Sequence, residues 1–202
     1  MIDVIHNPVA GPKVVNRIDR VRSYLSAHGL PFRIRETAAP GDAVVMAREA
    51  ALEGADAVVV VGGDGTMNEV ADGLAGSATR LVFVPHGTGN VFAREFSLPE
   101  SVEGCLDLLS SGKTISVRMA KANERRFVLL ASAGFDAEVV ERMNPRQKNF
   151  LGIAAYVLCG ARHLLRSQPT LWLEFPDRER VEAQAVLVVR GKKYGGNVTI
   201  AP

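Results

Sequence analysis

Four consecutive valines at positions 58–61 run directly into the turn Gly62-Gly63-Asp64-Gly65-Thr66. A strand that is apolar at every residue has both faces covered, as in parallel sheets flanked by helices. A turn made mostly of glycine leaves its backbone accessible, so a second molecule can approach the N–H groups closely. This stretch therefore predicts a buried parallel strand that ends at a ligand-binding turn.

The first 112 residues alternate between strand-like and helix-like patterns. Apolar or alternating runs predict strands at 2–5, 31–36, 56–61 and 80–85. Helical periodicity predicts helices at about 14–27, 41–54, 66–74, 89–96 and 99–112. Strand and helix in alternation predict an α/β fold, a doubly wound three-layer nucleotide-binding domain over residues 1–112.

The pattern changes after Lys113. Strand-like runs follow at 126–135, 170–175 and 182–191, with one long helix expected at about 146–167. We expect a strand-rich, β-sandwich-like second domain over residues 113–202. No closing element follows its last strand-like run, so we expect this domain to be incomplete at its C-terminal end.

The composition narrows the class of protein. The chain is 47% hydrophobic and 23% charged, as in ordinary globular proteins. Its net charge of +2, without a basic run interleaved with aromatics, gives no support for a nucleic-acid partner. The N-terminus does not resemble a signal peptide. The longest near-apolar run has 12 residues, whereas a membrane span needs about 20.

These features predict a cytoplasmic protein. The helix expected at 146–167 has cations towards both ends. Such a helix is compatible with peripheral contact to an anionic bilayer, at the inner face of the membrane, and equally with packing inside the second domain. The sequence does not fix the oligomeric state, and a homodimer is compatible with it.

A second glycine turn, Gly87-Thr88-Gly89-Asn90, follows the strand expected at 80–85. Ligands of open parallel sheets bind outside the carboxyl ends of the strands, where both turns should lie. Glycine backbone and a following helix N-terminus favour a phosphate group, and threonine hydroxyls can add donors. Two such turns in one sheet predict a phosphate site.

Asp64 stands in the first of these turns. A carboxylate beside phosphates repels them unless Mg²⁺ lies between, or unless it takes the proton of an attacking hydroxyl. Either role indicates phosphoryl transfer, and makes Asp64 the candidate catalytic residue. The structural alternative is a tight strand-to-helix turn in which Asp64 caps a helix.

Five stretches resemble the diacylglycerol kinase catalytic-domain family, which includes bacterial lipid kinases and sphingosine kinases. They are NPVAG (7–11), GGDGTMNEV (62–70), PHGTGNVFARE (85–95), SAGFDAEVV (132–140) and YGGNVTIAP (194–202). They follow the family's order and cover nearly the whole chain. GGDGT alone also occurs in NAD kinases, but its combination with GTGN and an N-terminal NPxxG turn is more specific.

The resemblance implies phosphorylation of a lipid hydroxyl, such as that of diacylglycerol, with ATP and Mg²⁺ as cofactors and the nucleotide between two domains. The nucleotide site that it implies comprises Asn7, Pro8, Val9, Ala10, Gly11, Thr37, Gly62, Gly63, Asp64, Gly65, Thr66, Met67, Asn68, Glu69, Gly87, Thr88, Gly89 and Asn90. The residues by themselves single out only the two glycine turns. The metal ligands are not assigned.

The chain departs from the family pattern in three places. Val91 stands where members often have aspartate, and Arg118 where many have an acidic residue. The family's C-terminal Asp-Gly motif, with its expected catalytic aspartate, is not among the 202 residues. We therefore expect weak ATP binding and little or no turnover from these residues alone. A non-catalytic nucleotide- or lipid-binding remnant and a kinase of soluble substrates, like NAD kinase, stay open as alternatives.

Overall fold

A computed structural model describes residues 1–11, 16–87, 89–135, 137–138, 170–191, 193–194 and 198–199 of the chain. These residues form two compact units. Unit 1 comprises Met1–Val128 together with the short strands near the C-terminus, and unit 2 lies within Leu129–Gly191.

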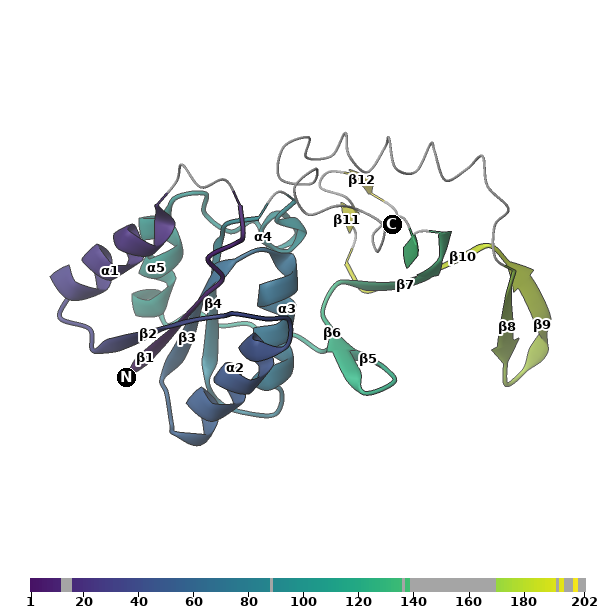
Figure 1. Cartoon of the computed structure of the whole chain (residues 1–202), viewed down its shortest axis with the longest axis horizontal. Coiled ribbons are helices and arrows are strands. Elements are labelled where there is room, and N and C mark those ends of the chain that lie inside the picture. The colour runs from purple at the N-terminus through teal and green to yellow at the C-terminus, as the bar shows by residue number, and fades with distance from the viewer. Residues whose placement is uncertain are drawn as a thin grey trace. The chain divides into compact units, whose positions relative to one another are not determined.

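Unit 1 is built on a parallel sheet of four strands in the order β2-β1-β3-β4 (Figure 1). The strands are β1 (Ile2–His6), β2 (Phe32–Glu36), β3 (Ala57–Gly62) and β4 (Arg80–Pro85). β2 lies on one side of β1, whereas β3 and then β4 follow on the other side. That reversal is the doubly wound connection that the alternating pattern predicts.

Helices cover both faces of this sheet, as Figure 1 shows. They are α1 (Arg17–Ala27), α2 (Asp42–Leu52), α3 (Asp64–Gly73), α4 (Val91–Glu95) and α5 (Val102–Ser111). α2 and α3 pack together on one face, and α1 and α5 pack together on the other. The three-layer α/β architecture of the first domain is therefore confirmed.

β3 shows why the valine run needs two covered faces. All six of its residues are buried. Val58 and Val60 belong to the core under α2 and α3, whereas Val59 and Val61 belong to the core under α1 and α5. Successive strand residues point to opposite faces, so four valines supply two cores at once.

The helix ends follow local chemistry. The helix expected at 66–74 begins two residues earlier, at Asp64, directly after β3. α5 begins at an N-cap serine, Ser101, whose hydroxyl accepts from the Gly104 N–H. It ends at Gly112, which has a left-handed backbone with φ of 68°.

Further antiparallel strands occur beyond α5. In unit 1, β5 (Ala120–Ala122) pairs with β6 (Arg125–Phe127), and β11 (Lys193–Tyr194) pairs with β12 (Val198–Thr199). In unit 2, β7 (Leu130–Gly134) pairs with β10 (Ala185–Val189), and β8 (Leu171–Phe175) with β9 (Arg178–Ala183). The strand expected at 126–135 is thus divided between two partners.

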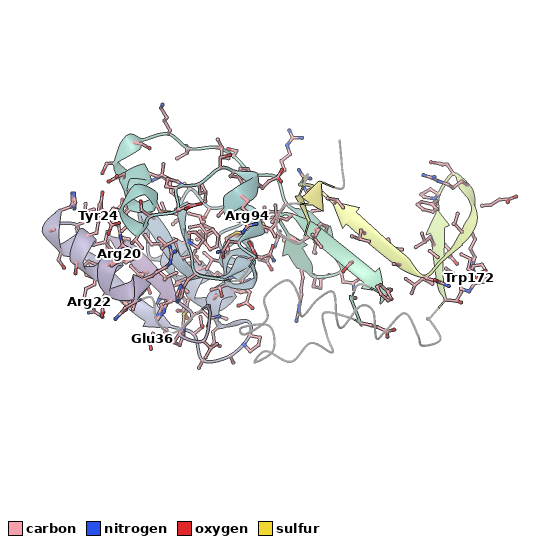
Figure 2. The ribbon with its side chains drawn as sticks, turned by 90° about the horizontal axis from the view of Figure 1, so that it is seen from above. Arg20, Arg22, Tyr24, Glu36, Arg94 and Trp172 are labelled. Atoms are coloured by element: carbon pink, nitrogen blue, oxygen red, sulfur yellow. The ribbon has the colours of Figure 1, made fainter. Side chains whose placement is uncertain are left out.

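The β8–β9 hairpin bears an exposed aromatic side chain, Trp172, which Figure 2 labels. The guanidinium of Arg180 lies 4.0 Å from its ring centroid, and that of Arg178 lies 4.2 Å from the centroid of Phe175. The strand expected at 182–191 is divided between the end of β9 and β10. The sequence predicts no strand at 178–181, where pairing with β8 forms one.

Some expectations fall outside the described residues. These are the helix at 146–167, with the bilayer contact it suggests, and Thr88 of the second glycine turn. In the part of the chain that the structure describes, every helix is too short or too polar to cross a membrane.

Candidate active site

The four parallel strands end at the same edge of the sheet. β1 ends at His6, which is paired with Glu36 at the end of β2 and with Val61 of β3. Gly62, the last residue of β3, is paired with Pro85, the last residue of β4. The loops that follow these strands therefore gather at one edge, where the sequence analysis expects the ligand.

The two glycine turns touch each other. A Cβ atom placed on Gly87 would lie 2.8 Å from Gly63 Cα and 2.9 Å from Asn90 Oδ1, too close for real atoms. The His86 N–H also donates to the Gly62 carbonyl at 2.6 Å. Glycine at position 87 is thus required by the approach of two backbones, independently of any ligand.

The N-terminal loop packs against the same turns. Gly11 has a left-handed backbone with φ of 68°, and a Cβ there would lie 2.0 Å from the carbonyl oxygen of His86. The Asn7 side chain donates from Nδ2 to Thr66 Oγ1 at 3.0 Å and accepts at Oδ1 from the Val9 N–H. The loop is consequently fixed to both glycine turns.

Asp64 is the first residue of α3, but its carboxylate serves another helix. Oδ2 accepts the backbone N–H of Val91 and Oδ1 accepts that of Phe92, each at 3.0 Å. These amides open α4, whose first N–H groups have no partner within the helix. Asp64 therefore caps a helix, as the structural alternative from the sequence expects, but that helix is α4 and not α3.

Asn90 closes the second glycine turn. It has a left-handed backbone, with φ of 45°, and its side chain accepts the Gly87 N–H at 2.8 Å and donates to the Gly87 carbonyl at 2.9 Å. Both amide atoms of Asn90 are engaged in the turn itself, so its contribution to the site is the shape of the backbone.

The N-terminus of α3 is left open to a ligand. Its N-cap residue is Gly63, which has no side chain to cap the helix. A Cβ on Gly63 would meet only Gly87 Cα at 3.5 Å, and a Cβ on Gly65 would meet no heavy atom within 4 Å. Neither glycine has the backbone conformation that requires glycine. A helix N-terminus without a side-chain cap, and with room beside its glycines among the described residues, suits an anion.

Other candidate residues have different surroundings. The Met67 side chain lies in the core, 1% exposed, and the Asn68 side chain is hydrogen-bonded to the backbone of residues 126 and 128. Thr37 follows β2 and donates its N–H to the His6 carbonyl at 2.9 Å. Pro8 and Val9 are exposed, Ala10 and Glu69 are half-buried, and Gly89 lies beside Asp64.

Two histidines lie beneath these loops. His6 Nδ1 is 3.2 Å from Glu36 Oε1. His86 is buried, and this burial, together with the neighbouring charges of Arg17 and His6, lowers the pKa of its imidazole. His86 is therefore neutral near pH 7, and it places no positive charge beside a bound anion.

No cluster of three histidine, cysteine or acidic side chains suited to a metal ion occurs in the described ranges. Both oxygens of Asp64 accept amide hydrogens. The described side chains do not, by themselves, build a magnesium site.

Comparison with known proteins agrees with this geometry. The sequence model of the diacylglycerol kinase catalytic domain matches residues 2–122, which include every loop described above. The chain belongs to this family.

Named relatives of the diacylglycerol kinase family extend the match beyond the first unit. A diacylglycerol kinase of Staphylococcus carnosus is 32% identical over 164 residues, which are 80% of this chain and 54% of that protein. A protein of Cronobacter sakazakii named "Probable lipid kinase YegS-like" is 30% identical over 192 residues, or 88% of this chain and 62% of that protein. The chain thus spans little more than half the length of these relatives.

A crystal structure of a family member supports the fold. The diacylglycerol kinase from Bacillus anthracis has a TM-score of 0.71 with 30% identity, over 96% of this chain and 66% of that one.

Val91, which stands where family members often have aspartate, contacts Asp64 through its backbone N–H. Any residue except proline has this N–H, so the hydrogen bond does not depend on the side chain at position 91.

Proposed function

We propose that the protein is an ATP-dependent lipid kinase, which transfers the γ-phosphoryl group of ATP to a hydroxyl group of diacylglycerol or a related lipid. Membership of the diacylglycerol kinase family supports the reaction class. The observation that supports the site is the open N-terminus of α3, where Gly63 and Gly65 leave room that nothing in the described chain fills.

The glycine turns would hold the phosphates of the nucleotide. The first N–H groups of α3 have no partner within the helix and lie at its positive end, so they suit phosphate oxygens. The Thr66 hydroxyl, held by Asn7 at 3.0 Å, orients the N-terminal loop towards the same place. ATP supplies the phosphoryl group and the leaving ADP.

The transfer forms one bond, breaks one bond and moves one proton. The acceptor oxygen forms a bond to the γ-phosphorus, the bond from that phosphorus to the bridging oxygen breaks with ADP as the leaving group, and the hydroxyl proton passes to water. Such reactions depend mainly on positioning and on stabilisation of charge. In this chain Asp64 is a positioning residue, because it joins the turn after β3 to the helix after β4.

The described side chains alone do not match the Mg²⁺ that the family implies. Mg²⁺ is commonly held by one or two carboxylates together with substrate phosphates. Asp64 stands in the first glycine turn, and its Oδ2 would lie 3.6 Å from a Cβ placed on Gly89, but its oxygens already accept two amides.

A phosphorylation assay tests the proposal. The purified protein would be given labelled ATP and, in separate reactions, diacylglycerol in mixed micelles or NAD. Transfer to the lipid, even at the low turnover that the sequence predicts for these residues alone, is the expected result. Transfer to NAD alone would replace the proposal with a kinase of soluble substrates, and ATP binding without any transfer would favour a non-catalytic protein.

Gly65→Ala tests the site separately. An added methyl group meets no atom of the described chain, so the fold should be unaffected or slightly more stable, by up to about 1 kcal/mol. The affinity for ATP, measured by calorimetry, should nevertheless fall, because the methyl group occupies the phosphate's space. Unchanged affinity would indicate that the phosphates do not bind at this turn.

A further inference from the structure

Asn68 lies on α3, one turn after the glycine turn, and its side chain contacts a distant part of unit 1. Nδ2 donates to the carbonyl of Arg126 at 3.0 Å, and Oδ1 accepts the N–H of Val128 at 3.0 Å. A side-chain amide that donates and accepts in this way replaces a strand partner for residues 126–128. Aspartate at this position could not supply the donor.

A second contact on the same helix reinforces the first. Asp72 lies four residues after Asn68 and so on the same face of α3. Its Oδ1 is 3.1 Å from Nη1 of Arg126, and the Asp72 side chain is 16% exposed. Between the two bonded residues, Phe127 is buried, and Val128 is buried as well. We call Asn68, Asp72 and residues 126–128 the α3 clamp.

The position of the α3 clamp along the chain gives it a consequence. α3 begins at Asp64, within the first glycine turn. The clamped segment ends at Val128, and the next residue, Leu129, is the first of unit 2. One rigid helix therefore joins the candidate phosphate site to the point at which the chain leaves unit 1.

We propose that Asn68 is a positioning residue for phosphoryl transfer: it fixes the start of the connection to unit 2 on the helix that begins at the phosphate turn. This inference rests on the proposed function, because the transfer that Asn68 would position is the one proposed above. It assigns Asn68 to acceptor alignment instead of the nucleotide contact that the sequence resemblance implies. A misplacement of about 1 Å can reduce the rate about 100-fold.

The first test requires no activity. Amide hydrogen exchange of the purified protein would be compared between the wild type and Asn68→Ala, with Asp72→Asn as a milder variant that leaves Asn68 in place. We expect faster exchange at Val128 and across β7 in both variants, and unchanged exchange in β1 and β3. Equal exchange in wild type and both variants would overturn the inference. Arg125→Gln, at an exposed side chain of the same strand, is the matched control and should change nothing.

The second test uses the lipid kinase assay and calorimetric titration with ATP. Asn68→Ala should lower kcat about 10- to 100-fold while the Kd for ATP stays within about twofold. A parallel loss of ATP affinity would indicate that Asn68 contacts the nucleotide, as the sequence resemblance implies. An unchanged kcat would exclude a positioning role. If the wild type itself transfers no phosphate, the proposed function fails, and the exchange experiment alone decides whether the α3 clamp exists.

Discussion

The Asp64 carboxylate lies 3.0 Å from the backbone nitrogen of Val91, a residue 27 positions further along the chain. This bond joins the turn after β3 to the helix after β4, and a second one to Phe92 repeats the connection. The aspartate of the GGDGT stretch thus has a structural role. Any chemical role of Asp64 would have to be compatible with these two hydrogen bonds.

Replacing Asp64 by asparagine measures how much these hydrogen bonds stabilise the fold. An amide can accept one of the two N–H groups but must turn its NH₂ towards the other, so one hydrogen bond is lost. We expect the free energy of unfolding in urea to fall by about 1–2 kcal/mol. Glu69→Gln removes the same charge from the same helix and serves as the control. A variant of normal stability without turnover would instead support the catalytic role of Asp64.

Gly87→Ala should damage the fold, unlike Gly65→Ala. The new Cβ would lie 2.8 Å from Gly63 Cα, and backbone can yield only by separating the two turns. Overpacking of this kind costs about 1–3 kcal/mol. Thermal unfolding of both variants checks the difference, and equal melting temperatures would contradict the close approach of the turns.

The carboxylate of Asp3 is the most deeply buried charge of the sheet. It is 0% exposed and accepts from Arg33 Nε and Nη2, both at 2.7 Å. Asp3→Ala removes the buried acceptor of these hydrogen bonds, while Arg33 keeps Glu53 as a partner, and should cost about 1.5–3 kcal/mol of unfolding free energy.

The matched control uses the other partner of the same arginine. Glu53 also pairs with Arg33, but its side chain is 51% exposed. Glu53→Gln should cost no more than about 1 kcal/mol, because water screens exposed pairs. Equal losses in urea unfolding of the two variants would show that Asp3 is accessible to water.

His86 should make stability dependent on pH. Its pKa is lowered in the folded protein by burial and by the charges of Arg17 and His6. The unfolded chain binds the proton at the ordinary pKa of about 6.5, so below that pH the unfolded state gains protons that the folded state does not. Stability should therefore decrease as the pH falls from about 7 to 5.

His86→Gln should reduce that slope by up to about 1.4 kcal/mol per pH unit, the value for one proton. Urea unfolding at several pH values measures it. His28→Gln, at an exposed histidine, is the control for the loss of an imidazole side chain. A slope that persists in His86→Gln would assign the pH dependence to a group other than His86.

The sequence by itself determined the four parallel strands and the helices of unit 1, and the edge of the sheet at which the candidate site lies. Periodicity is a local property, so the four valines of β3 reveal a strand covered on both faces without knowledge of its neighbours. Likewise, a glycine turn directly after a parallel strand indicates the ligand edge wherever the strand lies in the sheet. The sequence did not predict the first residues of β9, because charged residues give no strand signal. That part of the strand forms only by pairing with β8.

Only the tertiary structure decided what the site residues do. Asp64 caps a helix 27 residues away, Gly87 is required by Gly63, and Asn68 holds a segment 58–60 residues further along. Each of these contacts depends on which strands lie side by side and how closely their turns approach. A carboxylate, a glycine and an amide have the same local sequence signal whether their partner is a ligand or a distant backbone, so the partner becomes known only when the chain is folded.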